Sequence, residues 1–197
     1  YGNFDRRGLR TLMNERSSTS WIFGYGSLMW RPGFPFIERR EGFIRGWKRR
    51  FHQGSPDHRG TPEFPGRVVT LLEDAEATTW GVAYQLDPAH AADTLKSLDQ
   101  REQAGYQRVF LPVFSANEEP SIPEATTWIA TPENGDHLGE APLGEMVAQI
   151  LQASGPSGSN RDYVLALEQC LAAMSIVEDH VQTLAHGVTE TSRNPNH

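Results

Sequence analysis

Residues 79–86 read TWGVAYQL and alternate between two kinds of side chain. Trp80, Val82, Tyr84 and Leu86 point to one face of an extended chain, and small or polar side chains point to the other. A face of small side chains suits the interior of a barrel or the floor of a pocket. The stretch therefore predicts a strand of a small β-barrel.

Other segments extend this pattern on both sides. Aromatic, branched or nearly continuous apolar runs predict further strands at residues 21–25, 43–52, 67–72, 106–115 and 126–130. Residues 54–66 are rich in glycine and proline, which predicts a long loop between two of these strands. Loops of that length within a compact domain often act as lids over a site.

Helical signals occur once between the strands and again near the end of the chain. Asp87 and Pro88 suit the N-cap and first position of a helix whose inward face is Ala91, Leu95 and Leu98. Gly105 suits its end. Further helices are predicted at residues 143–153, 160–175 (with Asn160 as the N-cap) and 178–186. The chain is therefore predicted to be an α+β protein, a small, partly closed β-barrel flanked by helices.

The length of 197 residues suits one domain. We expect it at residues 20–186, with a flexible arm at 1–19 and a flexible tail at 187–197. The net charge of −7 disfavours nucleic acid and anionic membranes as partners. The single cysteine, Cys170, needs no oxidising compartment, and no apolar run approaches the roughly 20 residues of a membrane span. These features predict a soluble cytoplasmic protein, with its oligomeric state open.

The first candidate site is the turn Gly24-Tyr25-Gly26-Ser27-Leu28 at the end of the first strand. Two glycines allow a sharp turn, and successive N–H groups in such a turn can bind a carboxylate or a carbonyl oxygen. The alternative is an ordinary tight turn. The pattern is not the Gly-x-Ser-x-Gly of serine hydrolases.

Glu102 is the second candidate. The helical face of Ala91, Leu95 and Leu98 continues to position 102, which places a carboxylate toward the core in the last turn of the helix. Burial and the helix dipole would both raise the pKa of such a group, as a general base requires. The alternative is a solvated surface glutamate.

Metal and thiol chemistry are not indicated. The seven histidines have no ligand spacing and there is no second cysteine, so no metal and no cofactor are predicted. Cys170 lies on the apolar stripe of the predicted helix 160–175, with Tyr163 and Leu167, and suits the core better than a nucleophile role.

Six segments in order resemble the ChaC-like γ-glutamylcyclotransferase family. They are residues 21–30 (WIFGYGSLMW), 57–63 (DHRGTPE), 65–71 (PGRVVTL), 80–84 (WGVAY), 98–106 and 157–163 (SGSNRDY). The resemblance covers about residues 20–186. One departure is Ala104-Gly105, where many members carry two glycines.

This resemblance implies a function and a set of site residues. It implies a mixed barrel with a cavity at its mouth, glutathione as the small-molecule substrate, no cofactor, and Glu102 as the catalytic base. It places the γ-glutamyl group on the turn, with Ile22, Phe23, Gly24, Tyr25, Gly26, Ser27 and Leu28 as substrate-binding residues. Arg59 in the predicted lid could meet a carboxylate, and Tyr106 and Tyr163 complete the expected site.

Two other interpretations stay open. One is a cyclotransferase for free γ-glutamyl amino acids or γ-glutamylamines, from which substrate length would distinguish it. The other is a non-catalytic γ-glutamyl-binding module on the same barrel, against which the acid at position 102 argues. Which of Arg50, Arg67 and Arg101 meets the substrate is also open.

Overall fold

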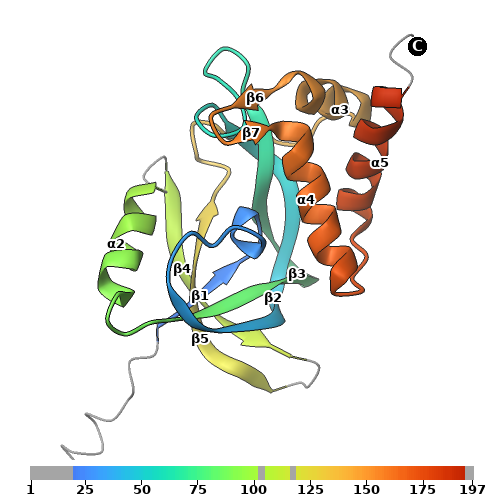
Figure 1. Ribbon diagram of the computed structural model, residues 1–197. Helices are drawn as coiled ribbons and strands as arrows, with labels where there is room; N and C mark the ends of the chain where they lie inside the picture. Colours follow the sequence, from blue (N-terminus) through green and yellow to red (C-terminus); the bar gives the residue numbers. More distant parts are fainter. Residues whose placement is uncertain (1–19, 102–104, 116–118, 194–197) are drawn as a thin grey trace, which may run out of the picture.

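The computed structural model describes residues 20–101, 105–115 and 119–193. Strands β1 (Trp21–Gly24), β2 (Phe36–Ser55), β3 (Gly66–Leu86), β4 (Tyr106–Phe114) and β5 (Pro120–Ala130) form a closed barrel in the order β1-β3-β2-β4-β5. The pairing of Ile22 with Thr126 is parallel and joins β1 to β5, whereas the other pairs are antiparallel. The prediction of a mixed barrel flanked by helices is confirmed (Figure 1).

The β2–β3 hairpin is longer than its sequence pattern indicates. The two strands expected at 67–72 and 79–86 are one continuous strand, because Glu73 and Thr78, at the two ends of the polar segment between them, still pair with β2. Glu73 lies opposite Trp47 and Thr78 lies opposite Arg45, with a register shift at Gly46, whose φ is +82°. Pairing with a neighbouring strand therefore overrides the local polarity of residues 73–78.

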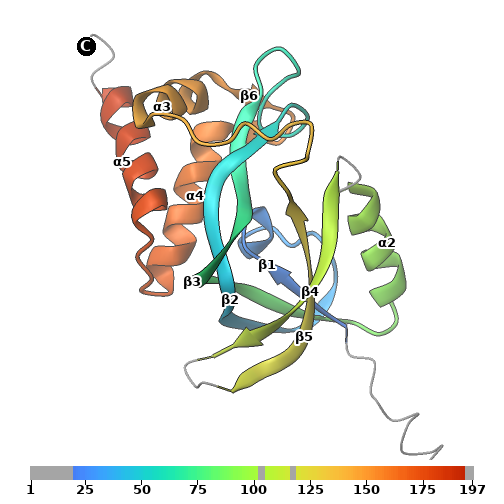
Figure 2. The ribbon, with the colours of Figure 1, turned by 180° about the vertical axis from the view of Figure 1, so that it is seen from behind.

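Helix α2 (Ala91–Arg101) covers one side of the barrel and α3 (Leu143–Gln152), α4 (Asn160–Ala173) and α5 (Asp179–Arg193) cover the other (Figure 2). Leu98 of α2 packs with Ile22, Leu86 and Trp128 in a small core of its own. Helix α2 begins at Ala91 and not at Pro88 as predicted, so Asp87 is not its N-cap. Asp87 instead closes the turn before the helix: its Oδ1 accepts a hydrogen bond from Ala89 N at 2.9 Å, and its carbonyl oxygen accepts one from His90 N at 2.9 Å. Of the helices in the described residues, none is both long and apolar enough to cross a membrane.

Helix α5 corrects the expected end of the domain. It runs through Gly187, where the flexible tail was expected to begin, and continues to Arg193. Val188 is fully buried, and a Cβ on Gly187 would lie 2.7 Å from Val147 Cγ2. The helix continues because α3 packs against it at this glycine, a tertiary contact that helix propensity does not reveal. The expected arm at residues 1–19 lies outside the described residues.

Asn160 does not cap helix α4 as predicted. Ser159 is the N-cap, and its Oγ accepts from Asp162 N at 3.1 Å. The fully buried Asn160 instead bridges the helix to β3: its Oδ1 accepts from Arg67 N at 2.6 Å and its Nδ2 donates to Arg67 O at 2.7 Å. A buried amide with both ends paired in this way fixes the start of α4 against the barrel.

His180 of α5 makes the stability of the fold depend on pH. Its Nε2 accepts from Phe51 N at 3.1 Å, so the ring must be neutral to keep this bond. Burial first, and then Arg50, His52 and Arg67 nearby, lower the pKa of His180 from 6.5 to about 4. Burial also lowers the pKa of His52, whose neighbours include His137, Arg67, Glu140 and Arg50.

The unfolded chain therefore takes up a proton near pH 6.5, before the folded chain does. The stability that neutral His180 contributes is complete above pH 6.5 and is lost as the pH falls from 6.5 toward 4. We expect urea unfolding midpoints to drop over this interval, and His180→Gln to show a shallower drop. His186→Gln, at an exposed position of the same helix, is the control. An equal pH dependence in wild type and His180→Gln would contradict this assignment.

Candidate functional site

A cavity of about 240 Å³ lies at the mouth of the barrel. Its walls come from the glycine turn (residues 24–28), from the lid loop (residues 56–65, joining β2 to β3) and from the start of α4. The cavity brings together most of the residues predicted for the site, namely Phe23, Gly24, Tyr25, Gly26, Ser27, Leu28, Arg59, Tyr106 and Tyr163.

Two predicted residues stand apart from this group. Ile22 does not line the cavity: its side chain is fully buried in the core under α2, because alternation along β1 sends it to the opposite face from Phe23. Glu102 lies outside the described residues. Arg101 and Tyr106, the last described residue before the gap at 102–104 and the second after it, both line the cavity.

The glycine turn needs its glycines for close packing. A Cβ on Gly24 would lie 2.6 Å from Leu28 Cβ, and one on Gly26 would lie 2.8 Å from the Tyr163 hydroxyl. The short helix η1 (Ser27–Met29) begins within the turn, so the N–H groups of its first residues have no acceptor inside the helix. Such N–H groups can bind an anionic or carbonyl oxygen of a ligand.

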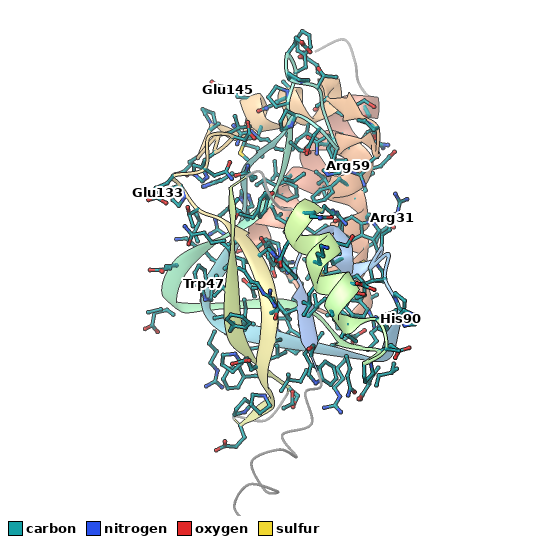
Figure 3. The ribbon with its side chains drawn as sticks, turned by 90° about the vertical axis from the view of Figure 1, so that its left-hand side faces the viewer. Arg31, Trp47, Arg59, His90, Glu133 and Glu145 are labelled. Carbon is teal, nitrogen blue, oxygen red and sulfur yellow. The ribbon has the colours of Figure 1, made fainter. Side chains whose placement is uncertain are left out.

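Arg59 extends from the lid loop across the cavity. Its Nη1 donates to Ser159 O at 3.1 Å, and its guanidinium carbon lies 5.4 Å from the centre of the Tyr163 ring. The Arg59 side chain is largely buried, and this burial lowers its pKa, with Arg31 adding to the effect. Figure 3 shows Arg31 and Arg59 on the same side of the molecule.

The lid loop is packed against the rest of the domain. Arg59 N donates to Ser55 Oγ at 3.0 Å, and Ser157 N, between β6 (Ser154–Gly155) and β7 (Gly158–Ser159), donates to His58 O at 3.0 Å. A Cβ on Gly60 would lie 2.3 Å from Gly66 N, so the middle of the loop packs tightly against the start of β3. The loop thus forms a fixed wall of the cavity in this structure.

The charges around the cavity favour an anionic ligand with a cationic part. Arg31, Arg59 and Arg101 contribute three guanidinium groups, and Asp57 and Asp136 contribute two carboxylates. Arg101 Nη2 donates to Ser27 Oγ at 3.3 Å, which ties the end of α2 to the glycine turn. Guanidinium groups bind carboxylates through paired hydrogen bonds. Within the described ranges, no group of three or more His, Cys, Asp or Glu could hold a metal.

The structure also answers which arginine faces the cavity. Arg101 lines it, whereas Arg67 is committed to the protein through Gln149 Oε1 at 2.6 Å, Phe51 O at 3.0 Å and Gly139 O at 2.9 Å. Arg50 lies in a separate cleft that includes His180.

Several cavity residues were missed by sequence reasoning. Gln53, Thr127, Trp128 and Asp136 come from β2, from β5 and from the turn after β5. Their positions depend on how the barrel closes, which no short motif encodes.

A family model described as "ChaC-like protein" matches residues 20–191. This chain belongs to the ChaC-like family. The residues that form the cavity fall inside this match, so the site is part of the ChaC-like domain.

Curated relatives of the ChaC-like chain carry names for one activity. Gamma-glutamylcyclotransferase 2-3 of Arabidopsis thaliana is 46% identical over 174 residues, covering 85% of this chain and 87% of the relative. Glutathione-specific gamma-glutamylcyclotransferase 1 of Homo sapiens is 48% identical over 150 residues, covering 75% and 67%.

A solved structure shares the ChaC-like fold. The crystal structure of a γ-glutamyl cyclotransferase specific to glutathione from yeast superposes with a TM-score of 0.77 at 29% identity. The match covers 87% of this chain and 96% of the yeast chain. The barrel and its helices are therefore the fold of a γ-glutamylcyclotransferase.

Proposed function

We propose that this chain is a glutathione-specific γ-glutamylcyclotransferase, which converts glutathione to 5-oxoproline and cysteinylglycine. The observation that carries the proposal is the cavity of about 240 Å³ that places the glycine turn opposite Arg59. Glutathione has a γ-glutamyl group, two carboxylates and an α-ammonium, which suits a cavity lined by three guanidinium groups, by two carboxylates and by the start of η1. The names of the relatives at 46% and 48% identity support the same activity.

The reaction is an intramolecular displacement. The α-amine nitrogen of the substrate attacks its own γ-carbonyl carbon and forms the new C–N bond of a five-membered lactam. The old amide C–N bond breaks, and the departing cysteinylglycine amine takes up a proton. Atoms and charge balance without oxidant, reductant, metal or water, so the protein must supply only geometry, a base and a site for the developing oxyanion.

Geometry is the first contribution of the protein. An extended γ-glutamyl chain holds its amine away from the γ-carbonyl, and the cavity must bend it. Holding two reacting groups in contact can lower the activation barrier by ~7–11 kcal/mol. In our proposal the N–H groups of Gly26 and Ser27 anchor the γ-glutamyl group and stabilise the oxyanion, and the close packing of Gly26 on Tyr163 sets their position.

The base is the second contribution, and we propose Glu102 for it. The α-amine arrives largely as an ammonium, which cannot attack until a proton is removed. A carboxylate can accept this proton and return it to the leaving amine. The lining of the cavity by Arg101 and Tyr106, on either side of residues 102–104, supports this assignment.

Product analysis tests the proposal. The purified chain is incubated with reduced glutathione, and 5-oxoproline and cysteinylglycine are quantified, with γ-glutamylalanine as a parallel substrate. We expect both products from glutathione and little turnover of γ-glutamylalanine. If the chain turns over γ-glutamylalanine and not glutathione, then its substrate is a free γ-glutamyl amino acid and the proposed specificity for glutathione is wrong. No product from either, with a folded protein, would reject the activity and favour a binding module.

Arg59 is expected to bind a carboxylate of the substrate. It is buried beside the cavity, it lies over the Tyr163 ring, and its bond to Ser159 O uses one of its five donors. We expect Arg59→Ala to raise the KM for glutathione roughly 10- to 100-fold, the usual cost of a lost charged hydrogen bond.

The matched control for Arg59 is Arg161→Ala, a half-exposed arginine near the start of α4 whose ion pair with Asp162 spans 4.0 Å. It should leave the KM near that of wild type. An unchanged KM in Arg59→Ala would exclude this residue from carboxylate binding.

A further inference from the structure

Gln53 lies at the inner end of β2, where it lines the cavity, and its side chain is only 1% exposed. Its Nε2 donates to Asn134 Oδ1 at 3.0 Å and to Gly54 O at 3.2 Å. Asn134 Oδ1 accepts a second hydrogen bond, from Asp136 N at 2.9 Å. Three residues from two distant parts of the chain thus hold one amide group in place.

These contacts fix which end of the Gln53 amide carries the oxygen. Both groups facing Nε2 are oxygens, and the Asn134 end is an acceptor because Asp136 N also donates to it. A flipped Gln53 amide would set oxygen against oxygen at both contacts. The carbonyl oxygen Oε1 therefore occupies the other end of the group.

In the part of the chain that the structure describes, Oε1 is buried and has no hydrogen-bond donor. Native proteins pair nearly all buried polar atoms, and those left unpaired often belong to a binding or catalytic site. Because Gln53 lines the cavity, a ligand in the cavity can supply the missing donor.

Only part of a γ-glutamyl substrate could meet Oε1. An acceptor repels the carboxylates and carbonyl oxygens, so the partners left are the α-amine, the peptide N–H groups and the thiol. The α-amine carries the most donors, and as an ammonium it forms the strongest bond to a carbonyl oxygen. Asn134 also lies next to the chain that follows the proposed base, since a Cβ on Gly105 would come within 2.8 Å of Asn134 Nδ2.

We propose that Gln53 Oε1 accepts a hydrogen bond from an N–H of the attacking α-amine and so selects substrates with a free amine. The inference rests on the proposed function and deepens it. After the base has taken one proton, the amine keeps two N–H groups and one lone pair. A bond from one N–H to Oε1 fixes rotation about the Cα–N bond and directs the lone pair at the γ-carbonyl carbon. Gln53 stays neutral throughout and no proton moves to it.

The test compares glutathione with its desamino analogue, glutarylcysteinylglycine, which cannot cyclise and serves as a competitive inhibitor. Gln53→Met keeps the length of the side chain and leaves Asn134 Oδ1 bonded to Asp136 N. We expect kcat/KM for glutathione to fall about 10- to 100-fold, as for a lost hydrogen bond to a charged group. The Ki of the analogue should stay within about twofold, because it has no amine to lose.

Other outcomes would overturn the proposal. An equal loss of affinity for both compounds would mean that Gln53 shapes the cavity or meets another part of the substrate. An unchanged kcat/KM in a folded Gln53→Met protein would mean that Oε1 does not contact the substrate at all. Melting curves establish folding for each variant. A wild-type protein that forms no 5-oxoproline would reject the proposed function instead.

One measurement does not depend on the variant. In the wild type, the Ki of glutarylcysteinylglycine should be at least about tenfold above the KM of glutathione, since the analogue leaves Oε1 unpaired. If the analogue binds as tightly as glutathione, then no group in the cavity holds the amine, and the role proposed for Gln53 is wrong.

Discussion

Glu102→Gln is expected to lower the turnover of glutathione by about 10²- to 10⁴-fold, the range usual for loss of a general base. Glutamine keeps the size of the side chain and its hydrogen-bonding capacity, but it cannot accept a proton from the ammonium. Because it does not alter the groups proposed to anchor the substrate, the KM should change far less than kcat. Initial rates of 5-oxoproline formation over a range of glutathione concentrations give kcat and KM for both proteins.

The matched control is Glu124→Gln, an exposed glutamate on β5 that does not line the cavity. It should show wild-type turnover. Near-wild-type kcat in Glu102→Gln would remove Glu102 from the role of base. A large rise in KM with kcat preserved would instead make it a binding residue.

Glu178→Ala is expected to destabilise the fold by about 3–5 kcal/mol, because it leaves a buried charge without its partner. Arg49 of β2 is buried, and its Nη1 lies 3.2 Å from Oε1 of Glu178, the residue before α5. Its Nη2 donates to Trp80 O. Burial lowers the pKa of Arg49 and raises the pKa of Glu178, which means that desolvation disfavours the charged form of each partner.

A double variant separates loss of the charge partner from loss of packing. Arg49→Met with Glu178→Leu removes both charges and keeps apolar volume, and it should be far less destabilised than Glu178→Ala alone. Equilibrium unfolding in urea measures all three proteins. If Glu178→Ala costs less than the double variant, then the ion pair does not anchor α5 to the barrel.

Local patterns predicted the elements of the barrel well where each element carried its own signal. The alternation of residues 79–86 and the apolar stripe with Tyr163 and Leu167 both correspond to observed elements. Predictions failed where a neighbouring element decides. Residues 73–78 continue the strand because Glu73 and Thr78 pair with β2, and α5 extends past Gly187 because Val147 packs there.

The candidate site divides in the same way. The glycine turn, Arg59 and Tyr163 were predicted because each lies in a contiguous motif that matches the ChaC-like family. Gln53 and Asp136 were not predicted as site residues. They come together where Gln53 bonds to Asn134, a residue 81 positions away in the chain. The role of Glu102 stays a prediction, because that residue lies outside the described ranges.

By itself, the sequence determined the family, the glycine turn and the strand and helix types, because these follow from residue types at short spacing. Tertiary structure alone decided that Ile22 faces a core and Phe23 the cavity, that Arg67 is bound by the protein while Arg59 and Arg101 line the cavity, and that Gln53 Oε1 is left unpaired. The physical reason is that burial and hydrogen-bond partners are properties of distant segments brought together. A closed barrel sets those segments side by side only after every strand has found its register.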